Sequence, residues 1–489
     1  MLFNSIAFAF FLPIVFIFYW FVFQRNLKIQ NIFVVISSYI FYGWWDWRFL
    51  LLIIFTSFCS WICGILMQYA DKQHITSSRS TFFRIFLNVS NIVLNLGILG
   101  IFKYYNFFVD SFVSAFASVG LHLQPSTLKI ILPVGISFYT FQALSYSIDV
   151  YKRKIEPTKD IVAFFAFIGF FPLLVAGPIE RATNLLPQFY KKRTFEYEKA
   201  VDGMRQILWG LFKKVIVADN CATYVNMVFD NPQSQSGITL LLGAFFFAFQ
   251  IYGDFSGYSD IAIGTARLFG INAMRNFAYP YFSRDIAEFW RRWHISLTTW
   301  FRDYVYIPLG GSRVSKVKVV RNTFIIFLVS GFWHGANWTF IAWGMFHAIL
   351  FLPLILLNQN RKYTNTVAER KLFPDLKEIF QMGLTFLLVV IGWVIFRADS
   401  IGQMLEYFGG MFDMSLFSLE LLLHRKIALK CLIFAFCMLL IEWIGRRNQY
   451  GLEILNINSK WLRHIVYLII IFCVILFMGQ NEQFIYFQF

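Results

Sequence analysis

Long apolar runs recur along this chain from one end to the other, separated by short polar connections. A membrane-spanning helix needs about 20 mostly apolar residues, and these runs approach that length repeatedly. Of the 489 residues, 58% are hydrophobic and only 14% are charged, whereas a soluble chain of this length would form several domains with polar surfaces. The sequence therefore predicts an all-α polytopic integral membrane protein.

The positions of the apolar runs predict about 11–13 transmembrane helices. The expected spans are 5–23, 31–43, 47–70, 85–102, 128–149, 204–228, 238–256, 322–341, 343–358, 378–396, 428–445 and 464–480. The first run lacks the basic start and cleavage site of a signal peptide, so a retained span is expected. Lysine and arginine concentrate in alternate connections, which the positive-inside rule places in the cytoplasm, with both termini outside. This distribution of the +16 net charge argues against a nucleic-acid partner.

One apolar run, residues 161–177, breaks this alternation because the connections on both of its sides are basic. It also contains Gly169, Pro172 and Gly177, which interrupt a helix. A re-entrant segment that enters and leaves on one side accounts for both features, and such a segment must be buried in protein or line a cavity. An ordinary span with an unusually basic outer loop is the alternative.

The six cysteines show neither a metal-binding spacing nor a disulfide framework. Most of them lie inside apolar runs, where a thiol packs as a small hydrophobic side chain. No metal site is therefore expected.

Two Trp-His pairs, Trp293–His294 and Trp333–His334, are the candidate functional groups. The second lies in the apolar run 324–357, and an ionisable side chain at membrane depth is costly enough to suggest a function. Imidazole titrates nearest to neutrality among the side chains, which suits proton transfer. A histidine hydrogen-bonded inside a helix bundle for structural reasons is the alternative.

The neighbours of His334 predict a polar site on one helix. If the helix continues, Ser330 and Asn337 share the face of His334 and reach its ring. Small residues such as Gly331 allow close helix packing or close approach of a ligand. His347, in contrast, has only apolar neighbours and is expected to be a core histidine.

The segment 279–321 is too charged to span a membrane and too aromatic for a free loop. On one amphipathic helix, at the cytoplasmic interface or inside the bundle, Glu288 would pair with arginines at helical spacing, and Trp290, Trp293 and His294 would share the neighbouring face. A turn at 308–313 would end this helix; it could hold the phosphates of a cofactor, although a plain turn is the simpler interpretation. Candidate pocket residues in this segment are Arg291, Arg292, Trp293 and Arg313.

Two aspartates, Asp254 and Asp260, are next to apolar helices and cannot face lipid. Three outcomes are open for them: pairing with the arginines of 284–292, binding a substrate, or orienting a histidine. Structural ion pairing is the commonest of the three.

The residues around these candidates resemble the membrane-bound O-acyltransferases (MBOAT). The motifs that carry the resemblance are Asp254–Asp260, Phe289–Leu297, Trp300–Arg313 and Gly331–Trp338. Further segments are similar to the bacterial subgroup of alginate O-acetylation, among them Pro133–Gln142, Ala176–Arg181 and the ending Phe484–Phe489. The motifs stand in the right order and cover the whole chain.

The resemblance implies one transmembrane domain with peripheral helices in 1–127, a catalytic core in 128–360 and further helices in 361–489. Its helices, some of them re-entrant or interfacial, would surround a central tunnel in which a cytoplasmic acyl donor meets an acceptor from the other face. His334 would be the catalytic residue and His294 the second one. As a chemical hypothesis, His334 is the general base, and Trp333, Asn337 and His294 shape the pocket and stabilise the oxyanion.

The implied function is O-acetylation of an extracytoplasmic, alginate-like polysaccharide by a multi-pass protein of the bacterial inner membrane. Acetyl-CoA would be the donor, with no tightly bound cofactor. Expected partners are membrane lipid, the polysaccharide acceptor and an extracytoplasmic acetyltransferase protein. The alternatives are D-alanyl or peptidoglycan O-acyl transfer, a covalent acyl-enzyme relay, a non-enzymatic polysaccharide transporter and an assembly scaffold.

Overall fold

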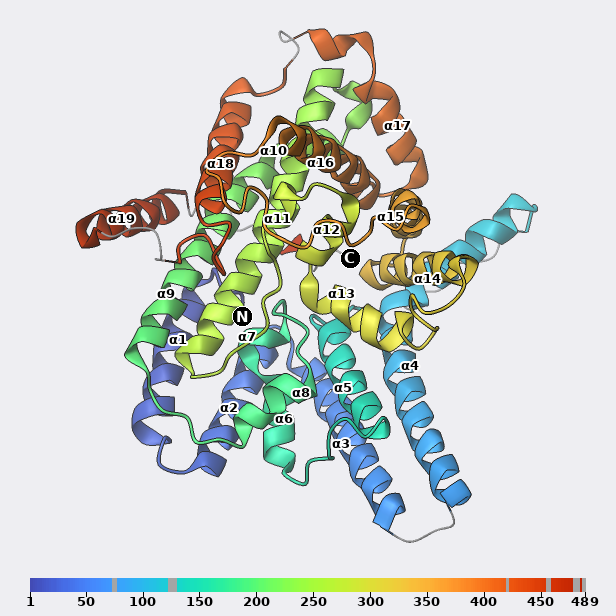
Figure 1. The fold of residues 1–489 in the computed structure, drawn as a ribbon, viewed down its shortest axis with the longest axis vertical. Helices are drawn as coiled ribbons and strands as arrows, with labels where there is room; N and C mark the ends of the chain where they lie inside the picture. The colour runs from blue at the N-terminus through green and yellow to red at the C-terminus, as the bar shows by residue number, and fades with distance from the viewer. Residues whose placement is uncertain (73–76, 122–129, 419–421, 454–458, 478–483, 486–489) are drawn as a thin grey trace. The chain divides into compact units, whose positions relative to one another are not determined.

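The computed structural model describes all residues except 73–76, 122–129, 419–421, 454–458, 478–483 and 486–489 (Figure 1). The described residues form helices and contain no strand, which confirms the predicted all-α class. The chain divides into two compact units: Met1–Gly203 with Thr265–Met274, and Met204–Gly264 with Arg275–Phe489. The predicted division at residues 127 and 360 stays a prediction.

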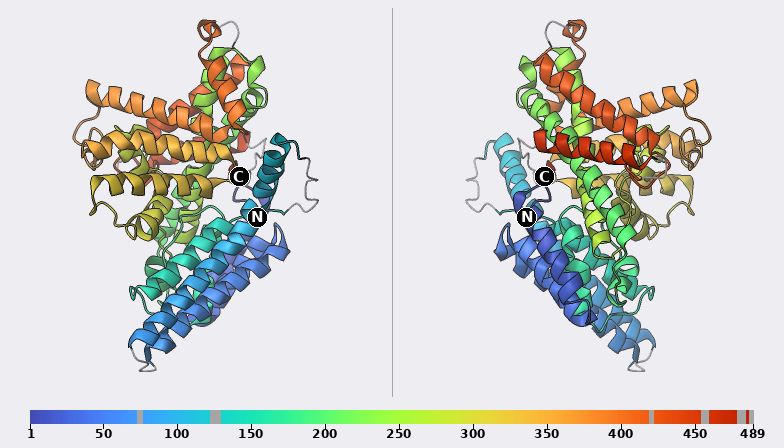
Figure 2. Two further views of the ribbon diagram at one scale, coloured as in Figure 1. Left: turned by 90° about the vertical axis from the view of Figure 1, so that its right-hand side faces the viewer. Right: turned by 90° about the vertical axis from the view of Figure 1, so that its left-hand side faces the viewer.

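Unit 1 is the N-terminal group of helices. They are α1 (Ile6–Ile17), η1 (Phe18–Val22), α2 (Leu27–Gly43), η2 (Trp47–Phe49), α3 (Leu50–Lys72), α4 (Ser77–Ser118), α5 (Ile136–Tyr151), α6 (Ile161–Gly169), α7 (Phe171–Leu174), α8 (Ala182–Leu185) and η3 (Leu186–Phe189). Helix α3 packs against α4 and α5, and α2 packs against α6. The long pair α3 and α4 lies side by side in both views of Figure 2.

The helix break expected in the run 161–177 is confirmed in unit 1. Helix α6 ends before Phe170, whose backbone is not helical, and α7 adds a single turn. At Gly177 a Cβ atom would lie 2.5 Å from the Cα atom of Leu173, so the backbone there approaches too closely for any side chain. The entry of this segment into the membrane from one side stays a prediction.

Unit 2 contains both Trp-His pairs. Two helices pass from one unit to the other along the chain, α9 (Tyr197–Leu211) and α11 (Gly237–Leu268). The other helices of unit 2 are η4 (Phe212–Ala218), α10 (Asp219–Phe229), η5 (Pro232–Ser234), η6 (Pro280–Phe282), α12 (Ile286–Arg292), α13 (Ile295–Phe301), η7 (Arg302–Tyr306), α14 (Lys316–His334), α15 (Trp338–Leu356), α16 (Leu376–Arg397), α17 (Ile401–Met411), η8 (Met414–Phe417), α18 (Arg425–Ile444) and α19 (Lys460–Phe477).

Within the described part of the chain, seven helices are long and apolar enough to cross a membrane. They are Trp47–Asp71, Arg79–Ser118, Gly237–Leu268, Trp338–Leu356, Leu376–Arg397, Arg425–Ile444 and Lys460–Phe477. Each overlaps a predicted span, although Arg79–Ser118 extends well beyond the predicted 85–102, and residues 478–480 of the last span lie outside the described residues. The chain is therefore a multi-pass membrane protein. The remaining spans and the orientation of the termini stay predictions.

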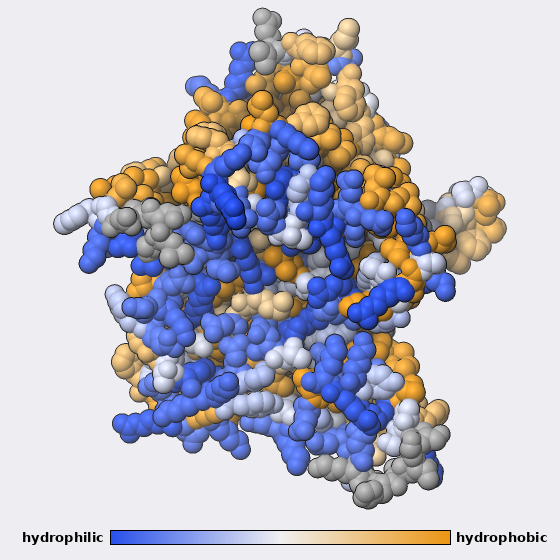
Figure 3. Space-filling view, in the orientation of Figure 1, coloured by the Kyte–Doolittle hydropathy of each residue, from blue (hydrophilic) through white to orange (hydrophobic). Residues whose placement is uncertain are grey.

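The surface of unit 2 agrees with a lipid environment. Large apolar side chains on α18 and α19, such as Phe436, Leu468 and Phe472, are exposed. Figure 3 shows hydrophobic residues gathered around α17 and α18, whereas hydrophilic residues gather over the connection between α15 and α16. An apolar side chain that faces outward is stable in lipid but not in water.

Candidate functional site

The chain turns directly after His334. Helix α14 ends at His334, and Gly335 has an extended backbone. Asn337 then caps α15 by accepting a hydrogen bond from the backbone N–H of Thr339 at 3.1 Å, and it donates one to the backbone oxygen of Asp399 at 2.7 Å. The prediction of one helix through 337, and of a span over 322–341, is therefore wrong. An asparagine side chain that satisfies a free N–H favours the start of a new helix over continuation of the old one.

Helices α14 and α15 pack at backbone contact, as the glycines predicted. A Cβ atom on Gly331 would lie 2.2 Å from the backbone oxygen of Phe340, and one on Gly344 would lie 2.4 Å from that of Phe327. Only glycine permits this approach. Because the two helices are locked together, the end of α14 holds His334 in one place.

The ring of His334 is buried in an aromatic cluster. Its centroid lies 5.0 Å from the ring of Trp333, 5.1 Å from Trp343 and 5.3 Å from Phe396, all at steep angles. These contacts come from α14, α15 and α16, so three helices fix the orientation of the ring. Ser330 is buried one turn earlier on α14.

The second pair, Trp293–His294, lies between two short helices, so the predicted single amphipathic helix is wrong. The backbone N–H of Ala278 donates to Arg292 at 2.9 Å, and that of Ile295 donates to Asn276 at 2.8 Å. These two bonds pull the chain out of helical geometry, and His294 adopts a left-handed backbone with φ of +42°. A non-glycine residue in this conformation is strained, and such strain concentrates at functional sites.

The indole of Trp333 lies against both histidine rings, at centroid distances of 5.0 Å for His334 and 6.1 Å for His294. The structure thus brings the two predicted histidines together, although they are far apart in sequence. The His294 ring also stands edge-on to Phe255 at 4.6 Å. Trp293 instead packs among other core aromatic rings, 4.8 Å from that of Trp393. The catalytic roles of these residues stay predictions.

His347, expected in the core, is fully buried on α15. Its ring lies 4.9 Å from Trp290 and 5.0 Å from Trp343. Trp343 therefore contacts both His347 and His334.

Asp254 and Asp260 form ion pairs with two lysines of the π-helix η4, and not with the arginines of 284–292. Lys214 lies 2.7 Å from Asp254 and 2.8 Å from Asp219, and its side chain is 1% exposed. Lys213 lies 2.5 Å from Asp260. Asp254 also accepts a hydrogen bond from the backbone of Ile485 at 2.7 Å. The two aspartates therefore contribute to buried charge pairs that hold η4 against α11.

Sequence reasoning missed these two lysines, although a signal for them existed. Lys213 and Lys214 lie inside the predicted span 204–228, and a charged residue at that depth requires a partner. The next predicted span, 238–256, contains Asp254, and Asp260 lies just beyond its end; these are the acids that the lysines need.

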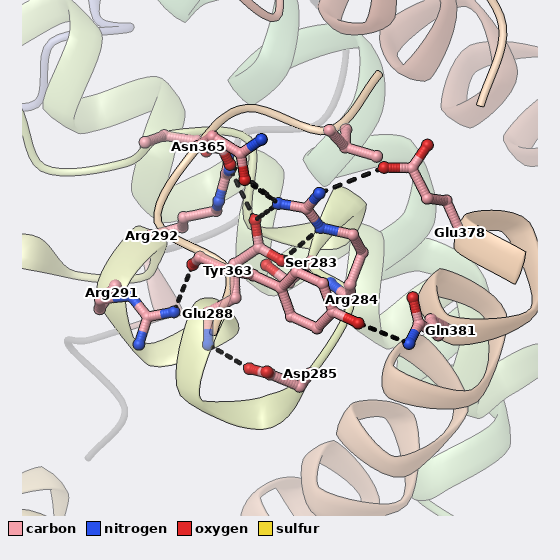
Figure 4. A network of polar contacts seen from close by, with 12 residues as sticks. Ser283, Arg284, Asp285, Glu288, Arg291, Arg292, Tyr363, Asn365, Glu378 and Gln381 are labelled. Carbon is pink, nitrogen blue, oxygen red and sulfur yellow. Dashed lines mark hydrogen bonds and ion pairs between the residues drawn. The ribbon is translucent and has the colours of Figure 1, made fainter. Parts of the chain in front are cut away.

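The predicted charge pairs of 284–292 are confirmed. Arg284 donates to Glu288 at 3.0 Å and to Glu378 at 3.1 Å, and Arg292 donates to Glu288 at 2.7 Å (Figure 4). Arg284 also donates to the backbone oxygen of Asn365 at 2.9 Å. This network joins α12, the start of α16 and the connection before it.

Of the remaining arginine candidates, Arg291 makes half-buried contacts and Arg313 lies in an exposed turn. Arg291 donates to the backbone oxygens of Asn360 and Tyr363 at 2.7 and 2.5 Å. Arg313 is exposed beside Gly310 and Gly311, whose positive φ angles of +101° and +56° form the predicted turn. In the hydrogen bonds and ring contacts described for His294 and His334, neither arginine is a partner.

The described residues contain no group of three or more His, Cys, Asp or Glu side chains that could hold a metal ion, and all six cysteines are free.

The comparison with known families decides the class of the protein. The profile of the membrane-bound O-acyltransferase family matches residues 39–391. The chain belongs to this family. It is therefore an O-acyltransferase, and the matched range contains both Trp-His pairs of this MBOAT protein.

The MBOAT chain is similar to bacterial proteins over most of its length. It is 40% identical over 415 residues to the probable alginate O-acetylase AlgI of Pseudomonas syringae pv. tomato, covering 84% of this chain and 75% of the relative. It is 40% identical over 455 residues to that of Pseudomonas aeruginosa, covering 92% and 82%. It is 34% identical over 440 residues to the peptidoglycan O-acetyltransferase of Helicobacter pylori, covering 84% and 80%.

His294 is expected to contribute a loss of stability to the MBOAT chain in mild acid. Burial lowers the pKa of His294 from its ordinary 6.5 to about 3. Between these two pKa values the imidazole is protonated in the unfolded chain and neutral in the folded chain. The contribution of His294 to the free energy of unfolding therefore falls by about 1.4 kcal/mol per pH unit as the pH drops below 6.5. Thermal unfolding in detergent at pH 7.5 and 5.5 measures this loss. The substitution His294→Gln should remove this contribution from the slope, whereas His464→Gln, at an exposed position, should leave the slope as it is in the wild type. Equal slopes in all three proteins would contradict the assignment.

Proposed function

We propose that the chain transfers acetyl groups to the hydroxyls of an alginate-like polysaccharide outside the inner membrane of a bacterium. The similarity to alginate O-acetylases supports this substrate, since 40% identity extends over 92% of the chain. The observation that carries the proposal is the placement of His294 and His334 against one indole, that of Trp333. Two imidazoles in a buried aromatic cluster suit acyl transfer to a hydroxyl.

The chemistry assigns His334 as the general base. Its ring takes the proton of the acceptor hydroxyl as the hydroxyl oxygen bonds to the acyl carbon of a thioester. The carbon–sulfur bond breaks, its electron pair leaves on the thiolate, and the proton is passed to that sulfur. Burial of His334 among Trp333, Trp343 and Phe396 excludes water, which would otherwise hydrolyse the thioester.

The donor we propose is acetyl-CoA, bound as a substrate and not as a resident cofactor. The turn at Gly310–Arg313 exposes Arg313, whose side chain faces outward and can approach a phosphate. Arg291 and Arg292 support the neighbouring connection through its backbone oxygens. Their proposed role is to hold that connection in place, and not to contact the donor directly.

The acceptor side of the proposal includes a protein partner. A membrane subunit that receives acetyl from the cytoplasm needs a route to a polymer outside, and an extracytoplasmic acetyltransferase partner would complete that route. Membership in a family of O-acyltransferases argues against a transporter or a scaffold. Neither of these functions would require the two adjacent histidines.

Peptidoglycan O-acetylation is the second candidate, supported by the relative from Helicobacter pylori at 34% identity. D-alanyl transfer is the remaining alternative within the same chemistry. The three differ in the ester that the cell envelope carries, which makes them separable by one measurement.

Mass spectrometry of envelope polymers from a deletion strain tests the proposal. We expect acetyl esters to disappear from the exopolysaccharide, to return with the wild-type gene, and to stay absent with the His334→Ala gene. Loss of acetyl esters from peptidoglycan alone would favour the second candidate, and loss of D-alanyl esters would favour the third. An unchanged pattern of esters in the deletion strain would overturn all of them.

A further inference from the structure

The side chain of Asn276 makes the closest described polar contact of His294. The Oδ1 atom of Asn276 lies 3.1 Å from Nδ1 of His294. Asn276 is fully buried on the extended segment that pairs with the backbone on both sides of His294. No motif reasoning singled it out, because it lies 18 residues before the histidine.

The orientation of the Asn276 amide is set by its other partners. The backbone N–H of Ser296 points to the same atom at 3.3 Å, and a backbone N–H can only donate, so this atom is the amide oxygen. The hydroxyl of Ser296 donates to it as well, at 2.9 Å. On the other side, Nδ2 of Asn276 donates to the hydroxyl oxygen of Ser259 at 3.0 Å.

An amide oxygen carries no hydrogen, so the imidazole nitrogen beside it must carry one. The alternative ring, protonated at Nε2, would set the lone pair of Nδ1 against the lone pairs of Oδ1 at 3.1 Å. The neutral ring of His294 is therefore protonated at Nδ1, and its lone pair is on Nε2. Because the ring is neutral, Nε2 carries no proton and cannot donate a hydrogen bond.

We propose that Asn276 is a positioning residue that holds His294 in the Nδ1–H tautomer, so that Nε2 accepts a hydrogen bond from a hydroxyl of the bound acceptor. This role rests on the proposed acyl transfer at the two histidines. It differs from the oxyanion role expected from the sequence, because a nitrogen without hydrogen cannot stabilise an oxyanion. His294 then orients the acceptor while His334 removes its proton.

Nitrogen NMR of the full chain, labelled with ¹⁵N-histidine in detergent, tests the tautomer directly. The signals of His294 are assigned by their loss in His294→Gln. We expect the proton on Nδ1 and the unprotonated type of shift on Nε2. In Asn276→Ala the ring should move toward a mixture of tautomers, while in Asn448→Ala, a buried asparagine that contacts no histidine in its described hydrogen bonds, it should not. A wild-type proton on Nε2 would overturn the proposal.

The activity profile gives an independent test. In Asn276→Asp a carboxylate faces Nδ1 and favours the imidazolium, which cannot accept a hydrogen bond, so the acid limb of the pH–rate profile should move to higher pH. Asn276→Ala should lower kcat/KM by about tenfold, a part of the 10²–10⁴-fold that a positioned side chain contributes. An unshifted acid limb in Asn276→Asp would overturn the role of Asn276. Full activity of His294→Gln would overturn the acceptor role of Nε2 but would leave the acyl transfer itself, which depends on His334.

Discussion

Replacing His334 by alanine is expected to abolish acetylation in the complemented deletion strain. A general base contributes about 10²–10⁴-fold to a reaction rate, and in the described ring contacts the other imidazoles of this cluster are those of His294 and His347. Alanine removes the proton acceptor but keeps the end of α14, which Gly335 and the cap at Asn337 form. Acetyl esters are measured by mass spectrometry at matched amounts of membrane protein.

The control for this variant is His464→Ala, because His464 is exposed on α19 and lies outside the family profile. It should retain wild-type acetylation. Acetyl esters at the wild-type level in the His334→Ala strain would rule out His334 as the base. Loss of the protein from the membrane would assign a structural role to the ring, which His334→Gln, a polar side chain of similar length, distinguishes from catalysis.

Replacing Lys214 by methionine is expected to destabilise unit 2 severely. The ammonium group of Lys214 lies between Asp219 and Asp254, and all three side chains are buried. Removing one partner of a buried ion pair costs about 3–5 kcal/mol, because the remaining charge has neither water nor a counter-charge. The midpoint of thermal unfolding in detergent should fall accordingly.

Two further variants separate this charge effect from loss of packing. Lys199→Met removes a lysine from an exposed pair with Glu196 and should cost about 0–1 kcal/mol. Lys214→Met combined with Asp254→Asn should recover part of the lost stability, since one unpaired charge disappears. If the single Lys214 variant unfolds at the wild-type temperature, the pairs are not the support that their burial indicates.

The positions of the long helices could be predicted from the sequence because lipid imposes a simple rule on composition. A run of apolar residues must be helical to satisfy its backbone, so the runs around 238–256 and 378–396 indicated α11 and α16. The break after α6 could also be predicted, because glycine and proline interrupt a helix through local backbone effects. These features depend on neighbours in sequence alone.

The site was less predictable where it depends on contacts between distant segments. His294 lies in a helical pattern, yet the segment 276–278 forms hydrogen bonds with the backbone of Arg292 and Ile295, and His294 between them adopts a left-handed conformation. No local pattern around 294 encodes that partner. The end of α14 was missed for a different reason. Gly335 and the capping residue Asn337 follow His334 and separate two helices, but the apolar run across them was interpreted as one continuous span. The meeting of both histidines at Trp333 follows from the tertiary fold.

The two lysines of η4 also constrain how this sequence can change over evolutionary time. Lys213 pairs with Asp260 and Lys214 pairs with Asp254, both on α11. Between these two aspartates lie Phe255, which contacts His294, and Ser259, which contacts Asn276. A mutation that removes one charge leaves its partner buried and alone, so single steps are strongly disfavoured. We therefore expect lysine and aspartate to be lost or exchanged together among homologous chains. The two positions of each pair should covary, although they are distant in sequence.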